Sequence, residues 1–145
     1  MKQILKIAVP ADYFFHRIIE SSLYDIQQQT GKKPNPNQLK GFSFKRKNAN
    51  GTMSTMTITA YQPDKKYAYH MHTGRNDYDV AYNVESLGNE QMRLTYEETI
   101  EGKSASVNAN NYVSGFLVGW VRKRRFKKMK RQMESDYIQQ ESHKS

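Results

Sequence analysis

Two charged residues share the phase of an apolar strand face, and both could do chemistry inside the fold. Arg46 continues the alternation to which Phe44 belongs, and Glu98 follows Tyr96 by two positions. Side chains two apart on a strand point to the same face. One interpretation is that both charges face inward, where each needs a partner such as the polar end of a ligand. The sequence favours the other interpretation, in which both lie at strand ends and reach water.

Two histidines have a spacing that suits metal ligands. His70 and His72 are two apart on a predicted strand, so both point to one face. Their phase is opposite to that of Tyr69 and Met71, which places them outside, and spacing indicates no third ligand. The sequence therefore predicts no metal site and no cofactor.

Several classes of catalytic chemistry are excluded or unsupported. The chain has no cysteine, which excludes disulfides, thiol catalysis and cysteine-based zinc sites. The sequence shows neither a nucleophile–base–orienter pattern nor a glycine-rich phosphate loop. Nothing in it points to a reaction, so the sequence leans against an enzyme without deciding the question.

Hydrophobic periodicity predicts the elements that must position these residues. Apolar residues alternate over residues 3–9 and predict a strand. Helical spacing follows between Pro10 and Gly31. Pro10 suits the first turn of a helix, and Gly31 suits its C-cap. Residues 41–101 have a period of two and predict about five antiparallel strands. A last helix is expected over about residues 108–140.

These elements predict an α+β fold. Only one face of the meandering strands has a full apolar set, and a helix must cover it. We expect a curved antiparallel sheet of about six strands wrapped on a long C-terminal helix. At 145 residues, we expect one domain over 1–145 with a frayed polar tail at 139–145. No apolar run is long enough for a signal peptide or a membrane span, so the expected compartment is the cytoplasm.

This order of elements resembles the helix-grip fold of the START and Bet v 1-like superfamily, which includes polyketide cyclases and aromatases. Residues 7–14 resemble its strand, proline-containing corner and aromatic-bearing helix. Phe126, Met129, Met133 and Glu134 resemble its terminal-helix ending. The chain is also similar to a bacterial branch of the superfamily whose function is not assigned. The resemblance implies a cavity for apolar small molecules between sheet and terminal helix. It implies no reaction, because one fold hosts many functions.

The predicted inward face is rich in tyrosine, which suits a pocket with few polar groups. The alternative is that the rings fill the core and leave no cavity. We predict binding of a hydrophobic small molecule or lipid, whose polar end Glu98 or Arg46 would orient. A cyclase- or hydrolase-like enzyme in the same cavity is an alternative. The predicted ligand-binding residues are Phe44, Arg46, Tyr69, Tyr78, Tyr82, Tyr96, Glu98, Gly115 and Gly119.

The apolar face of the terminal helix changes sides near Arg122. On a helical wheel Phe116, Leu117 and Trp120 lie nearly opposite the apolar residues of 126–137, which a single straight amphipathic helix does not do. Three interpretations follow. In the first, the helix kinks or begins late near Arg122. In the second, Phe116, Leu117 and Trp120 form a homodimer contact. In the third, these three side chains insert into a membrane surface as a peripheral contact.

The same helix contains a block of positive charge. Residues 122–131 hold eight Lys or Arg and no acid, and these account for all but +1 of the formal net charge of +9. The block predicts docking on an anionic membrane or nucleic acid, but the absence of a recognised reader motif disfavours nucleic acid. It could equally lie near residues 77–101, which carry seven acids and one base. The predicted docking residues are Arg122, Lys123, Arg124, Arg125, Lys127 and Lys128.

Overall fold

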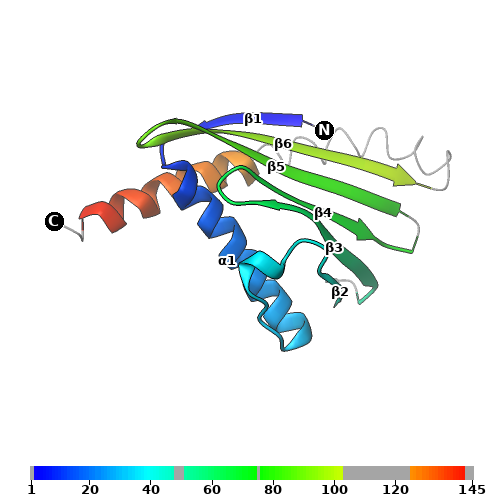
Figure 1. The fold of residues 1–145 in the computed structure, drawn as a ribbon. Helices are drawn as coiled ribbons and strands as arrows, with labels where there is room; N and C mark the ends of the chain where they lie inside the picture. The colour runs from blue at the N-terminus through cyan, green and yellow to red at the C-terminus, as the bar shows by residue number, and fades with distance from the viewer. Residues whose placement is uncertain (1, 48–50, 75, 103–124, 143–145) are drawn as a thin grey trace.

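A computed structural model describes residues 2–47, 51–74, 76–102 and 125–142. Six strands form one antiparallel sheet in the order β1-β6-β5-β4-β3-β2 (Figure 1). The strands are β1 (Lys2–Ile7), β2 (Ser43–Lys47), β3 (Met53–Gln62), β4 (Lys66–His72), β5 (Asn76–Gly88) and β6 (Gln91–Gly102). The helices are α1 (Ala11–Thr30), the short 3-10 helix η1 (Pro36–Gln38) and a C-terminal helix that covers residues 125–142.

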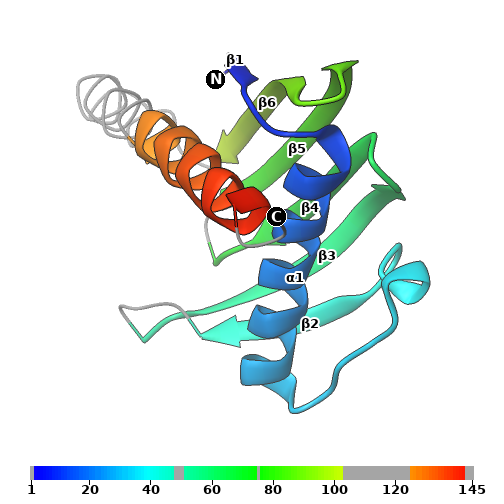
Figure 2. The same ribbon diagram turned by 90° about the vertical axis from the view of Figure 1, so that its left-hand side faces the viewer.

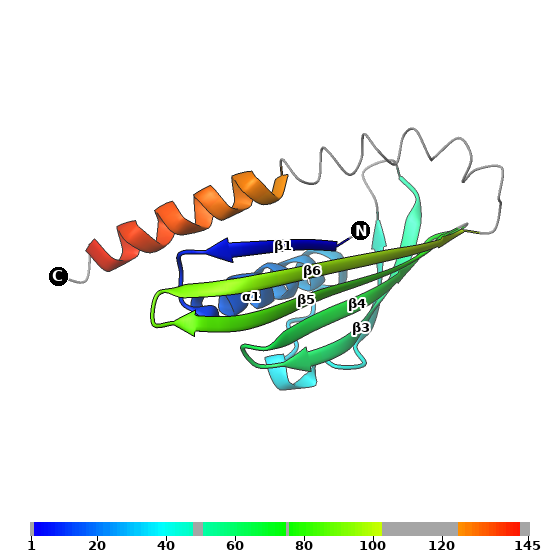
Figure 3. The same ribbon diagram turned by 90° about the horizontal axis from the view of Figure 1, so that it is seen from above.

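The two long helices lie on the same face of the curved sheet (Figure 2). Seen from above, the C-terminal helix extends beyond the edge of the sheet on the side where β1 ends (Figure 3). The expected α+β helix-grip architecture is therefore confirmed. The tail expected to be frayed from residue 139 is helical as far as residue 142.

The bounds of α1 follow from its terminal residues. Pro10 is the N-cap in an extended conformation rather than part of the first turn, and Asp12 places a negative charge near the positive end of the helix dipole. Gly31 ends the helix with a φ of 75°, and its N–H donates to the carbonyl oxygen of Gln27 at 2.8 Å. A left-handed C-cap of this kind favours glycine. The buried face of α1 consists of Ala11, Phe14, Phe15, Ile19, Leu23 and Ile26.

The register of the sheet decides which side chains share the inner face. Tyr82 of β5 lies opposite Tyr96 of β6, and Val80 lies opposite Glu98. Because alternate residues of a strand face the same side, these four side chains belong to one layer. The predicted alternation of these two strands is confirmed.

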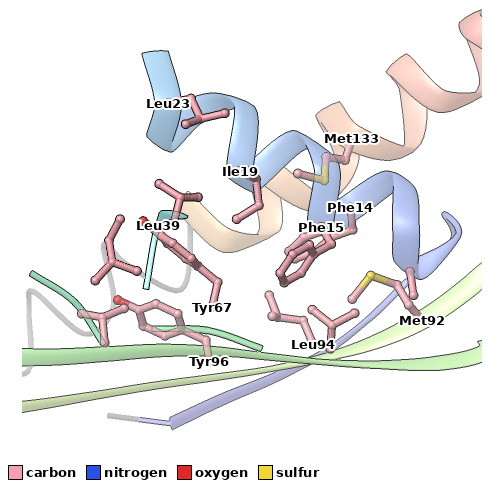
Figure 4. Packing of buried hydrophobic residues seen from close by; sticks show 14 of the residues in the cluster. Phe14, Phe15, Ile19, Leu23, Leu39, Tyr67, Met92, Leu94, Tyr96 and Met133 are labelled. Atoms are coloured by element: carbon pink, nitrogen blue, oxygen red, sulfur yellow. The ribbon is translucent and has the colours of Figure 1, made fainter. Parts of the chain in front are cut away.

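The core fills the space between this inner face and the helices (Figure 4). Phe14 of α1 and Leu94 of β6 are completely buried, and Met133 of the C-terminal helix is 7% exposed in the same cluster. Figure 4 shows Met133 beside the side of α1 that carries Phe14 and Ile19. The C-terminal helix therefore contributes to the same core as α1 and the sheet.

Polar contacts also fix the C-terminal helix to the first part of the chain. The backbone N–H of Ala8 donates to Oε2 of Glu134 at 2.7 Å. The guanidinium of Arg17 donates to Oδ2 of Asp136 at 3.0 Å. The proline-containing corner and the terminal-helix ending, which carry the family resemblance in the sequence, thus contact each other.

The inner face of the C-terminal helix is the one expected for residues 126–137. Phe126, Met129 and Tyr137 are partly buried against the core. The kink, homodimer and membrane interpretations stay predictions, because they depend on residues outside the described ranges: Phe116, Leu117 and Trp120. In the part of the chain that the structure describes, no helix is long and apolar enough to cross a membrane.

Candidate functional site

A cavity of about 840 Å³ lies between the inner face of the sheet and the C-terminal helix. Its volume falls within the range of roughly 300–1,000 Å³ that is usual for small-molecule sites. Four aromatic rings line it: Tyr69, Tyr78, Tyr96 and Phe126. Methionine side chains, which adapt to irregular apolar shapes, line it at Met53, Met71 and Met129. Seven of the thirteen described residues that line the cavity are therefore aromatic or methionine, and the wall also carries polar groups.

A buried carboxyl group forms part of the cavity wall. Glu98 is only 5% exposed, and the hydroxyl of Tyr96 donates to its Oε2 at 2.9 Å. Burial raises the pKa of Tyr96, and the negative charge of Glu98 and this hydrogen bond raise it further. Tyr96 therefore keeps its proton and acts as a donor to Glu98.

The favoured prediction for Glu98, a strand end in contact with water, is wrong. β6 continues to Gly102, and Val80 lies directly opposite Glu98 within the sheet. The residue consequently faces the space beneath the C-terminal helix, in agreement with the alternative interpretation of its strand phase.

Arg46 lies in a different environment. Its Nε is 3.3 Å from Oδ2 of Asp25 on α1, and its side chain is 41% exposed. It lines a second cavity of about 530 Å³, together with Phe44 and Tyr82. For Arg46, contact with water is confirmed, and its partner is a carboxylate of the protein.

The predicted ligand-binding residues are thus divided between two cavities. Tyr69, Tyr78, Tyr96 and Glu98 line the larger one. Tyr69 and Met129 line both, so their side chains lie where the two cavities adjoin. Burial raises the pKa of Tyr82 to about 12 and also raises that of Tyr69, so both rings remain neutral.

The sequence did not single out three residues that the structure places at these sites. Tyr67 is 1% exposed, lines the smaller cavity and accepts a hydrogen bond from the hydroxyl of Ser22 at 2.7 Å. It has the same strand phase as Tyr69, which could have indicated its inward position. Phe126 and Met129 belong to the helix ending that carries the family resemblance, and their helical spacing is the signal that could have indicated a cavity wall.

Part of the predicted docking surface belongs to the described helix. Arg125 is exposed and also lines the larger cavity, while Lys127 and Lys128 are exposed on the helix. The other predicted site residues of this region lie outside the described ranges: Gly115, Gly119, Arg122, Lys123 and Arg124.

The two histidines of β4 form a cluster with aspartates of β5 on the surface of the sheet. His70 Nδ1 is 2.9 Å from Oδ1 of Asp79, and its Nε2 is 3.1 Å from Oδ1 of Asp77. The same Asp77 oxygen is 2.7 Å from Nδ1 of His72. Within the described ranges, no group of three or more His, Cys, Asp or Glu side chains is arranged to hold a metal ion.

We expect His70 to titrate above the ordinary histidine pKa of 6.5, chiefly because Asp79 hydrogen-bonds the ring and Asp77 adds a second contact. Because the pKa of His70 is raised in the folded protein, protonated His70 stabilises the fold. This stabilisation is complete below the pKa of His70 in the unfolded chain, and it is lost as pH rises through its pKa in the folded protein. NMR titration of the ring protons should show a lower His70 pKa in Asp79→Asn. Asp12→Asn should leave the pKa of His70 unaltered. If the pKa of His70 did not fall in Asp79→Asn, Asp79 would not be the cause of its raised value.

The described architecture, with two helices on the inner face of a curved antiparallel sheet and a cavity under the C-terminal one, is the helix-grip fold. Residues 1–119 match the family described as "Domain of unknown function (DUF3284)", and the chain belongs to that family. No curated protein matches the sequence.

Solved structures share this fold at low sequence identity. A conserved protein from Geobacillus kaustophilus has a TM-score of 0.61 at 10% identity, covering 94% of this chain and 95% of its own. A START superfamily protein from Mycobacterium smegmatis has a TM-score of 0.54 at 10% identity, with 96% and 97% covered. DynU16, from the dynemicin biosynthetic locus, has a TM-score of 0.56 at 13% identity; the match covers 96% of this chain but 46% of DynU16. These likenesses show the fold.

Proposed function

We propose that this protein binds a hydrophobic small molecule or lipid in the larger cavity, without an assigned reaction. The observation that carries the proposal is the composition of the wall, in which aromatic rings and methionine side chains surround the buried Tyr96–Glu98 pair. An apolar ligand would gain roughly 25 cal/mol for each Å² of apolar surface removed from water. The few polar groups would fix its orientation.

Two further observations support a ligand site over a filled core. Tyr69 and Met129 are only partly buried, because both line cavities beneath the C-terminal helix instead of filling them. The START-like fold adds support, since the family resemblance implies a cavity for apolar molecules. The proposal covers a single domain of residues 1–145 acting in the cytoplasm.

Native mass spectrometry of the purified protein, followed by organic extraction, tests this function. We expect a discrete bound mass that extraction releases. Met71→Trp should reduce the bound fraction, because the larger side chain occupies cavity volume. A matched Thr59→Trp change at an exposed position of β3 should not. Retention of the same mass by Met71→Trp would argue that the ligand lies elsewhere.

The basic part of the C-terminal helix favours a second candidate function, docking on an anionic membrane. Arg125, Lys127, Lys128 and Arg131 are exposed. Among the described residues, these four side chains form no ion pair with a carboxylate. Basic side chains near an anionic bilayer contribute roughly 1 kcal/mol each. The position of Arg125 at the larger cavity would bring a membrane close to the ligand site.

Changing Arg125, Lys127 and Lys128 to glutamine should weaken binding to phosphatidylserine-containing vesicles by about a hundredfold, given roughly 1 kcal/mol per charge. Vesicle co-sedimentation at several salt concentrations measures the loss, and the salt dependence of binding should fall with it. Glutamine at Lys32, Lys33 and Lys40, which are exposed elsewhere, removes the same charge and is the control. Equal losses in both triple variants would show an effect of net charge alone.

A further inference from the structure

We propose that the ligand of the larger cavity is an amphiphilic amine, bound with its positively charged nitrogen beside Glu98 and its apolar body against the surrounding rings. This inference rests on the proposed function and specifies the chemistry of the ligand. Glu98 supplies the anionic end of the site, and the aromatic residues beside it supply surfaces that attract a cation.

The position of Glu98 makes its carboxylate a recognition group. The side chain is 5% exposed and lines the cavity, so a ligand there would meet it away from bulk water. The Tyr96 hydroxyl donates to Oε2 and holds the group in place. A carboxylate can accept about four hydrogen bonds in total, so donors of a ligand would add to the contacts that Glu98 already makes.

The distribution of charge along the wall decides the sign of the ligand. Arg46, the other charged residue predicted to face inward, lines the smaller cavity and pairs with Asp25. Arg125 lines the larger cavity but is exposed, so it lies at the solvent end of the site. Among the described residues that line the larger cavity, the charged side chain at the buried end is acidic and the one at the exposed end is basic.

A fatty acid would be poorly matched to this arrangement. Its carboxylate would lie beside Glu98 in a poorly solvated space, where like charges repel strongly. An ammonium group would instead form a charge-assisted hydrogen bond with Glu98, which is stronger than a bond between neutral groups. Burying a charge is costly unless it is paired, and an ammonium group placed here would be paired with the carboxylate of Glu98, which keeps its hydrogen bond from Tyr96.

The rings of the cavity favour the same class of ligand. Tyr96 lies on the side of the sheet that faces the helices (Figure 4), and its ring centroid is 4.6 Å from that of Phe126. Tyr69 and Tyr78 complete the aromatic part of the wall. A cation near the face of such rings is attracted by them, most strongly when water is excluded. The raised pKa of Tyr96 and of Tyr69 keeps both rings neutral and available for this contact.

Three probes of equal chain length test the inference: dodecylamine, dodecanol and dodecanoic acid, each titrated calorimetrically below its micelle-forming concentration. We expect dodecylamine to bind about tenfold more tightly than dodecanol, since its ammonium adds the attraction of opposite charges to the hydrogen bond that either head group can donate to Glu98. Dodecanoic acid should bind most weakly. Glu98→Gln should remove the preference for the amine while retaining the alcohol. Glu97→Gln, the same change on the adjacent exposed residue of β6, should preserve the wild-type order.

Equal or weaker binding of dodecylamine compared with dodecanol overturns the inference, and so does a preference for the amine that survives in Glu98→Gln. The order of the three probes on the unaltered protein distinguishes the ligand classes even if Glu98→Gln does not fold. Binding of dodecanol alone, or of dodecanoic acid most tightly, leaves the proposed hydrophobic site intact and rejects the amine. No binding of any probe, together with a clean protein mass in native spectra, rejects both.

Discussion

Replacing Phe14 by alanine is expected to lower the free energy of unfolding by about 3–5 kcal/mol. The ring is completely buried in the cluster that joins α1 to the sheet. Its removal loses the free energy of burying the ring and leaves a cavity that the neighbouring side chains fill only in part. Denaturant titration followed by circular dichroism should show a lower midpoint with an unchanged slope.

Tyr24→Ala provides the matched control for this change. Tyr24 is an aromatic residue of the same helix but is 66% exposed, so its loss should cost about 0.5 kcal/mol or less. If the two variants lost similar stability, α1 would not be packed through the face that carries Phe14. The experiment therefore checks the orientation of α1 as well as the size of the effect.

The elements of this fold could be predicted because each has a local signal. β5 alternates without interruption from Tyr78 to Val84, and the structure places that set on one strand. The left-handed Gly31 ends α1 where the sequence predicted its C-cap. Period, turn residues and caps act over a few neighbouring positions, so they can be recognised without knowledge of the tertiary structure.

The division of the site into two cavities has no such local signal. Arg46 and Glu98 have the same inward phase, yet one pairs with Asp25 and the other is buried beside Tyr96. The difference arises from the packing of α1 beside β2 and from the length of the β5–β6 ladder. Both are long-range properties, and a single strand pattern contains neither.

Two side chains of the C-terminal helix should have different roles: Met133 should mainly stabilise the fold, and Phe126 should mainly contribute to ligand binding. Met133 is 7% exposed and packs in the core with α1 residues. Phe126 lines the larger cavity and packs on Tyr96 at 4.6 Å between ring centroids. The two side chains are on the same inner face of the helix, so alanine at each position compares their roles directly.

Met133→Ala is expected to lower the free energy of unfolding by about 2–5 kcal/mol, because a buried methionine leaves a cavity in the core. Phe126→Ala should cost less stability, since the Phe126 ring is only partly buried. It should weaken the binding of dodecylamine more than Met133→Ala does, because it removes part of the cavity wall. Denaturant titration and calorimetry, at a temperature where both variants are folded, measure the two effects. If Met133→Ala weakened the binding of dodecylamine as much as Phe126→Ala, the position of the whole helix would control binding. A greater loss of affinity in Phe126→Ala alone would assign that control to the aromatic wall beside Glu98.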